Sequence, residues 1–236
     1  MNDTCKDRVE EVLAEIRNAA ASCGRDAEDI TLMGVSKTHP WDAVLEGYDA
    51  GIRLFGENRV QEVEAKFPPL ADRPQGMELH LIGHLQSNKV KKIVPLVDGI
   101  ASVDSLKLAA MISDCALSLG RTISVLLEFN TSGEEAKSGF ETEDDLFEML
   151  DHAEELKGIR IQGLMTVGPL GGDEKIVREA FAHLRNLREK CRASYPSINF
   201  DTLSMGMSGD FPWAIEEGST MVRVGTRLFG ARDYSK

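Results

Sequence analysis

Lys37 is the residue whose type and setting point most directly to chemistry. It ends a short, largely apolar segment, residues 31–37, and turn-forming residues follow it. Such a run is typical of a strand buried on both faces, and lysine is rarely buried without a partner. An amine in a partly dry pocket can lose its proton and form a Schiff base with an aldehyde. The alternative, which this segment alone favours, is that Lys37 marks the strand end and points to solvent.

Two glycine-rich segments near the end of the sequence are candidates for binding an anion. Residues 204–209 read Ser-Met-Gly-Met-Ser-Gly, and Gly225 and Thr226 follow a later apolar segment. Glycine lets backbone N–H groups approach an anion closely. In a (β/α)8 barrel, the loops after strands seven and eight often form a phosphate site. We therefore expect phosphate binding here, the alternative being that these glycines only turn the chain.

Arg223 is a second unusual residue, because it lies inside the short apolar segment 221–224. Either face of a barrel strand is enclosed, so a charge near its end needs a partner. Two interpretations are open on spacing alone. Arg223 either forms an ion pair with a strand-end carboxylate such as Glu57, or its guanidinium donates to a ligand.

The hydrophobic pattern predicts a scaffold of alternating strands and helices that would position these residues. We expect strands at residues 31–37, 52–55, 78–82, 99–103, 122–129, 159–165, 202–205 and 221–224. We expect helices at residues 3–23, 40–50, 59–66, 86–92, 105–119, 143–156, 173–194 and 212–217. This alternation implies a parallel sheet, and its eight units favour a single TIM (β/α)8 barrel with an extra N-terminal helix. A doubly wound sheet is disfavoured because no Gly-x-Gly-x-x-Gly turn follows the first strand.

Composition excludes several classes of partner. The 236 residues contain 27 Lys and Arg against 39 Asp and Glu, a formal net charge of −12 that disfavours nucleic acid and anionic membranes. We find no signal peptide and no apolar run long enough to cross a bilayer. The cysteines are widely spaced, and no cluster has metal-ligand spacing, so we expect free thiols, a cytoplasmic location and no metal. Without a linker, residues 1–236 are predicted to form one domain, with residues 1–24 as a helix packed on the barrel.

Seven motifs of this sequence recur together, in the same order, in one family. They are residues 34–38, 55–62, 80–89, 132–140, 163–166, 203–208 and 222–230, which include Gly-Val-Ser-Lys-Thr, Phe-Gly-Glu-Asn-Arg-Val-Gln-Glu and Val-Arg-Val-Gly-Thr-Arg-Leu-Phe-Gly. On these motifs the sequence resembles the pyridoxal-phosphate homeostasis proteins (the YggS/PROSC group). That family is similar to the N-terminal barrel domain of alanine racemase.

The resemblance implies a cofactor and a set of residues that bind it. It implies that Lys37 forms the internal aldimine with pyridoxal 5′-phosphate and that Arg223 faces the pyridine nitrogen. It also implies that Ser204, Gly225 and Thr226 hold the phosphate and that Asn58 lines the ring pocket. It assigns no catalytic residue.

An arginine beside the ring nitrogen favours holding the cofactor over catalysis. Arginine donates a hydrogen bond there without giving up its proton, which weakens the ring as an electron sink. The resemblance implies that alanine racemase takes its second base, a tyrosine, from a C-terminal β domain that we expect this chain to lack. The tyrosines at 48, 195 and 234 do not occupy matching positions.

We therefore expect a monomeric carrier or regulator of pyridoxal phosphate with little or no catalysis. It would act in vitamin B6 and amino-acid homeostasis and would meet pyridoxal-phosphate-dependent apoenzymes transiently. One alternative is a pyridoxal-phosphate-dependent amino-acid racemase. Another is a Schiff-base aldolase of phosphosugars, which would share the lysine and the phosphate-binding loops.

Overall fold

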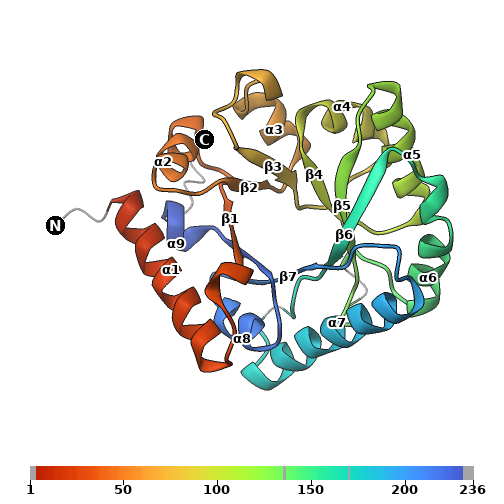
Figure 1. Ribbon diagram of the computed structural model, residues 1–236. Coiled ribbons are helices and arrows are strands. Elements are labelled where there is room, and N and C mark those ends of the chain that lie inside the picture. The colour runs from red at the N-terminus through yellow and green to blue at the C-terminus, as the bar shows by residue number, and fades with distance from the viewer. Residues whose placement is uncertain (1–3, 135–136, 170, 231–236) are drawn as a thin grey trace.

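The computed structural model describes residues 4–134, 137–169 and 171–230. In these residues, eight parallel strands close into a barrel in which each strand pairs with the next and β8 pairs with β1 (Figure 1). The strands are β1 (Thr31–Val35), β2 (Leu54–Glu57), β3 (Glu78–Leu81), β4 (Gly99–Val103), β5 (Ile123–Glu128), β6 (Ile159–Met165), β7 (Thr202–Met207) and β8 (Met221–Val224). The predicted TIM barrel is confirmed.

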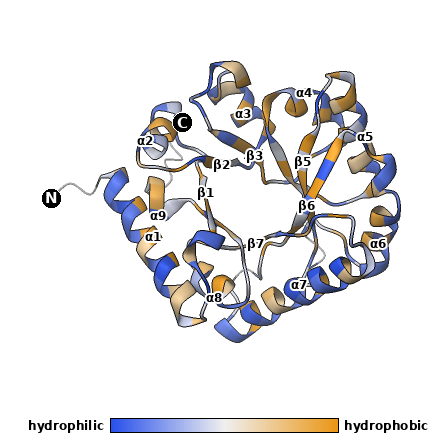
Figure 2. Cartoon of the chain, in the orientation of Figure 1, coloured by the Kyte–Doolittle hydropathy of each residue, from blue (hydrophilic) through white to orange (hydrophobic). Residues whose placement is uncertain are grey.

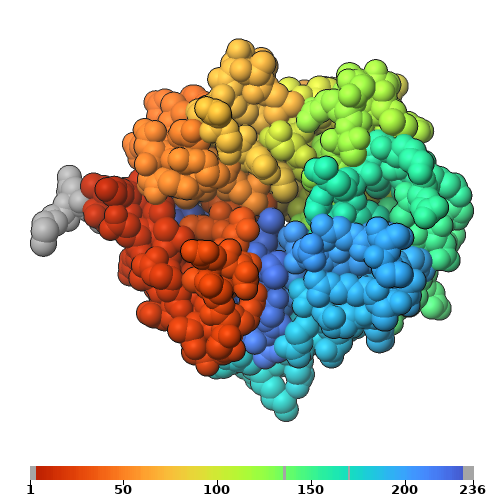
Figure 3. Space-filling model, in the orientation of Figure 1, coloured from red at the N-terminus to blue at the C-terminus, as the bar shows by residue number. Residues whose placement is uncertain are grey.

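Helices surround the barrel on its outside (Figure 1). They are α1 (Cys5–Ser22), α2 (Trp41–Asp49), α3 (Val60–Lys66), α4 (Val90–Ile93), α5 (Leu106–Ser118), α6 (Glu143–Asp151), α7 (Glu174–Ser194), α8 (Phe211–Glu216) and α9 (Thr226–Phe229). The extra N-terminal helix α1 packs on α2, α8 and α9. In the space-filling view, the blue C-terminal segment lies directly against the red N-terminal one (Figure 3).

Helix α7 shows why these segments are helical. Its buried residues recur every three or four positions: Val177, Ala180, Phe181, Leu184, Leu187 and Cys191. This spacing places them on one face of a helix, which packs on the strands, while the polar residues between them face water. Figure 2 shows the resulting mixture of hydrophobic and hydrophilic residues along α7.

The strands use their two faces differently, because successive side chains point to opposite sides. Phe55 belongs to the large core between strands and helices. A smaller apolar cluster fills the inside of the barrel and comprises Met33, Leu54, Ala101, Leu126, Met165 and Met221. This cluster closes the barrel between a cavity of about 350 Å³ on one side, which Leu54 lines, and a cavity on the other, which Ile82 lines.

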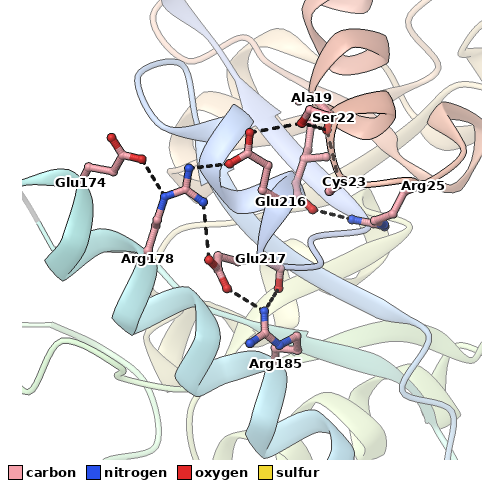
Figure 4. Close-up of polar contacts among 10 residues, drawn as sticks. Ala19, Ser22, Cys23, Arg25, Glu174, Arg178, Arg185, Glu216 and Glu217 are labelled. Atoms are coloured by element: carbon pink, nitrogen blue, oxygen red, sulfur yellow. Dashed lines mark hydrogen bonds and ion pairs between the residues drawn. The ribbon is translucent and has the colours of Figure 1, made fainter.

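Ion pairs to α7 and hydrogen bonds to the N-terminal region hold the short helix α8 in place (Figure 4). Arg178 of α7 contacts both Glu216 and Glu217 at the end of α8. Arg185 Nη1 lies 2.6 Å from Glu217 Oε2, and Arg25 Nη1 donates to the Ile215 carbonyl at 2.8 Å. The network fixes α8, which directly follows the loop after β7.

Some predicted boundaries were wrong. The second strand was expected at residues 52–55, but β2 covers Leu54–Glu57, so a charged residue occupies a strand position. The helix expected at 86–92 is a 3-10 turn, Ser87–Lys89, followed by the single-turn helix α4. Pro95 has no backbone N–H to continue an α-helical ladder and instead lies in a further 3-10 turn, Val94–Leu96.

Three further observations concern the cysteines, membrane-spanning helices and metal ligands. The cysteines at 5, 23, 115 and 191 are free thiols, as predicted. Among the described residues, no helix has the length and apolar character needed to cross a membrane. The same residues contain no group of three or more His, Cys, Asp or Glu side chains that could hold a metal ion.

Candidate functional site

A cavity of about 400 Å³ lies at the C-terminal ends of the barrel strands. This is the end of a TIM barrel where functional groups gather, and the volume suits a small ligand. Of the predicted site residues, Lys37, Asn58, Arg223, Gly225 and Thr226 line this cavity. The structure therefore brings five residues from three separate segments of the chain to one place.

Lys37 lies in the turn immediately after β1, and its side chain lines the cavity. The residue before it, Ser36, is fully buried. The residue after it, Thr38, has φ of 67° and is the only non-glycine residue of the described chain with positive φ. This left-handed conformation is strained for a β-branched residue, so the surrounding contacts must impose it.

A buried carboxylate, Glu57, supports this turn from the adjacent strand end. Its Oε1 accepts a hydrogen bond from Ser36 Oγ at 2.6 Å and a second from Lys66 Nζ. Burial raises the pKa of Glu57 to about 7, against the opposing effects of the Lys66 charge and of its hydrogen bonds with Lys66 and Ser36. The carboxyl therefore holds its proton to a higher pH than an exposed glutamate does.

Arg223 lies in β8 and is almost fully buried. Its Nη1 donates to Ser204 Oγ at 2.7 Å and its Nη2 donates to the Thr166 carbonyl at 2.8 Å. Burial lowers the pKa of Arg223 to about 10, opposed by the charges of Glu128 and Asp210, so the guanidinium stays cationic at neutral pH.

The ion pair suggested between Arg223 and Glu57 does not form. Glu57 pairs with Lys66 instead, and no carboxylate among the described residues lies within ion-pair distance of Arg223. A buried cation that lines a cavity without an ion-pair partner is suited to a ligand that offers an acceptor.

The structure gives Ser204 a different position from the predicted phosphate contact. Ser204 is fully buried within β7, its hydroxyl binds Arg223, and it does not line the cavity. Ser208, four residues later in the same glycine-rich segment, does line it, and its Oγ accepts from the Gly225 N–H at 3.2 Å. The family resemblance implied Ser204 for the phosphate, whereas in this structure Ser208 is the serine of the segment that lines the cavity.

Glycine at 206 allows the loop after β7 to lie close to α8. Gly206 has φ of 92°, and a Cβ built there would lie 2.5 Å from the Ala214 Cβ on α8. The next residues turn back toward the cavity, where the Met207 N–H donates to Asp210 Oδ1 at 2.5 Å. The result is a compact loop whose small residues, Ser208 and Gly209, face Gly225 and Thr226.

Asn58 contributes an oriented polar atom on another side of the cavity. Its Oδ1 is buried and has no hydrogen-bond partner among the residues that the structure describes. A Cβ on Gly83 would lie 2.3 Å from the Asn58 carbonyl oxygen, so glycine at 83 permits this close approach. An unpaired buried acceptor costs free energy, which a ligand donor would recover.

The tyrosines of the described chain are used elsewhere. Tyr48 donates through its hydroxyl to the Gln75 carbonyl at 2.8 Å, and Tyr195 donates to Asp151 Oδ1 at 2.7 Å. Neither lines the cavity, and Tyr234 lies outside the described residues. Among the described residues, the titratable side chains that line the cavity are those of Lys37, His39 and Arg223.

Comparisons with known proteins agree with this geometry. Residues 9–233 match the model of the alanine racemase N-terminal domain. The pyridoxal phosphate homeostasis protein of Vibrio alginolyticus is 41% identical over 232 residues, which are 98% of each chain. PipY of Synechococcus elongatus PCC7942, solved with PLP bound, has 40% identity and a TM-score of 0.79 over 91% of this chain and all of PipY. An alanine racemase of Clostridium difficile 630 shares the fold, with a TM-score of 0.73 at 18% identity. The matched region is 98% of this chain and 58% of the racemase chain.

Proposed function

The chain belongs to the family of pyridoxal phosphate homeostasis proteins, and we propose that it binds pyridoxal 5′-phosphate in the cavity at the C-terminal ends of the strands. One observation carries the proposal. One cavity is lined by the amine of Lys37 after β1 and by the buried guanidinium of Arg223 in β8. The loops after β7 and β8, which are rich in small residues, line the same cavity. The PLP-bound relative PipY, at 40% identity, supports it.

Each lining residue has a role in this proposal. Lys37 Nζ, in its neutral form, would condense with the aldehyde carbon, whose oxygen would leave as water, and Arg223 would donate to the ring nitrogen. Ser208, Gly225 and Thr226 would surround the phosphate, with Ser204 acting on Arg223 instead of on the ligand. The orphaned acceptor of Asn58 would line the ring. When bound, the group supplies a reversible carbonyl and an electron-accepting ring.

The buried arginine favours storage and transfer over catalysis. Arg223 keeps its proton at neutral pH, so it donates to an unprotonated ring nitrogen and limits the ring as an electron sink. We accordingly assign a carrier or regulator role in vitamin B6 and amino-acid homeostasis, with transfer to pyridoxal-phosphate-dependent apoenzymes. We further propose that residues 1–236 act as one monomeric domain in the cytoplasm, with which the free thiols agree.

The decisive experiment is to reduce the bond between Lys37 and the ligand aldehyde to a stable one and to locate it. The purified protein is mixed with pyridoxal 5′-phosphate, reduced with borohydride and digested, and each lysine peptide is weighed by mass spectrometry. We expect the reduced adduct on the Lys37 peptide and its loss in Lys37→Ala. The control Lys190→Ala removes an exposed lysine on α7 and should leave the adduct unchanged. An adduct that survives Lys37→Ala on another lysine to the same extent would contradict the proposal.

A further inference from the structure

Side chains of α3 and of the end of β2 hold both neighbours of Lys37. We propose that Glu57, Glu62 and Lys66 are positioning residues that fix the backbone of the Lys37 turn, so that its amine meets the aldehyde of the bound group. The inference rests on the proposed function of the cavity. None of the three lines that cavity, so each acts through a neighbour of Lys37 and not by contact with the ligand.

Lys66 and Glu57 fix the residue before Lys37. Lys66 Nζ, at the end of α3, donates to the Ser36 carbonyl at 2.8 Å and also to Glu57 Oε1. Glu57 Oε1 in turn accepts from Ser36 Oγ. The two charged side chains are 9% and 0% exposed, so these hydrogen bonds form in a site of low dielectric, where they are strong. The main chain and the side chain of Ser36 are therefore both held.

Glu62 fixes the residue after Lys37. Its Oε2 accepts a hydrogen bond from the Thr38 N–H at 3.0 Å. Thr38 is the residue in the left-handed conformation, which costs free energy that its contacts must offset. Glu62 and Lys66 are four residues apart and therefore lie on the same face of α3. One face of one short helix thus holds both residues that flank Lys37.

If Glu57, Glu62 and Lys66 only stabilised the fold, they would not need to be hydrogen-bonded to the residues on either side of Lys37. A buried ion pair is often no more stabilising than apolar side chains of similar volume, because both charges must be removed from water. What an apolar pair cannot supply is a donor for the Ser36 carbonyl and an acceptor for the Thr38 N–H. The polar groups are matched to the backbone on either side of Lys37, which indicates that the position of this turn is what they secure.

The test compares two ligands that differ only at the carbon that Lys37 would attack. Pyridoxal 5′-phosphate carries an aldehyde, and pyridoxine 5′-phosphate carries an alcohol on the same ring with the same phosphate. For Glu62→Ala, and for the double variant Glu57→Gln with Lys66→Met, we expect roughly tenfold weaker binding of the aldehyde and unchanged binding of the alcohol. The double variant removes both buried charges together, so it avoids leaving one unpaired.

Conservative variants and a distant control complete the design. Glu62→Gln retains an acceptor for the Thr38 N–H and Lys66→Arg retains a donor for the Ser36 carbonyl, so both should recover aldehyde binding. Lys190→Met removes a lysine of a surface pair with Glu143 and should change neither ligand. An equal loss of both ligands, or no loss of either, would overturn the inference. If wild-type protein binds both ligands but yields no reduced adduct at Lys37, the proposed covalent anchor itself is wrong.

Discussion

Arg223 Nη1 donates a hydrogen bond to Ser204 Oγ at 2.7 Å, between the adjacent strands β8 and β7. In this bond Ser204, which the family resemblance assigned to the phosphate, serves as an acceptor for Arg223. Ser208, whose Oγ accepts from the Gly225 N–H, is the serine that lines the cavity. Substituting Ser204 and substituting Ser208 should therefore have different effects on ligand binding.

Ser208→Ala should weaken binding of pyridoxal 5′-phosphate and of pyridoxine 5′-phosphate equally. A hydrogen bond to a charged group such as the phosphate is worth about 1.5–3 kcal/mol, or roughly ten- to a hundredfold in affinity. Ser204→Ala should instead leave the phosphate contacts intact and alter the spectrum of the bound cofactor, because Arg223 loses a fixed acceptor. Fluorescence titration and visible spectra of the two variants distinguish these effects. A larger loss of pyridoxine phosphate binding for Ser204→Ala than for Ser208→Ala would count against the assignment.

Glu57 should make the stability of the protein fall as the pH rises from about 4.5 to about 7. In this window the folded protein binds the Glu57 proton more tightly than the unfolded chain, so unfolding becomes easier as pH increases. The full effect is at most about 3 kcal/mol. Glu57→Gln cannot titrate, so the free energy of unfolding of wild type relative to this variant should decrease across the window.

Urea denaturation at several pH values measures that difference. Parallel pH profiles for wild type and Glu57→Gln would show that the carboxyl titrates at its ordinary value. The comparison cancels the contributions of every other titratable group that the substitution leaves unchanged.

Gly206→Ala should destabilise the protein by about 2–4 kcal/mol, because its Cβ would approach Ala214 to 2.5 Å in a backbone conformation with positive φ. Gly209→Ala is the matched control in the same loop, since a Cβ there meets no atom within 4 Å. Thermal or urea unfolding of both variants tests this. Equal free energies of unfolding for Gly206→Ala and Gly209→Ala would contradict this prediction, because α8 would then move away from residue 206 without a loss of stability.

The α-proton of an amino acid should exchange with deuterated water no faster with this protein than with free pyridoxal phosphate. The reason is the guanidinium of Arg223, which weakens the electron sink, combined with the position of Tyr48 and Tyr195 outside the cavity. Proton NMR of a panel of amino acids in deuterated water provides the measurement. Exchange at catalytic rates would favour the racemase interpretation and would point to His39 as a candidate proton carrier.

Much of the barrel could be predicted because aliphatic runs set its strands. Strands β4, β6 and β8 have the predicted boundaries, since Gly99–Val103, Ile159–Met165 and Met221–Val224 are bounded by polar or turn residues. The C-terminal ends of these strands then determine where a site lies. The same rule predicts that Lys37, Arg223 and Gly225 lie at one end of the barrel, where all three line the cavity.

What the sequence could not supply are pairings between distant side chains. A glutamate such as Glu57 is typical of a loop, and the hydrogen bonds from Lys66 of α3 and from Ser36 are what accommodate it in a buried strand. Likewise, nothing in the spacing of residues 204–208 reveals which serine meets Arg223, because that choice depends on the register between β7 and β8, which shifts between Ser204 and Met207.

The pairing of β8 with β1 has a consequence for how the protein is made. During translation Lys37 emerges first, and Ser208, Arg223 and Gly225 follow about 170 to 190 residues later. Chains are synthesised at about 5–20 residues per second, so on the order of ten seconds separates the two halves of the cavity. A nascent chain therefore exposes Lys37 before the opposite wall of the cavity exists, and ligand binding must await the synthesis of β7 and β8.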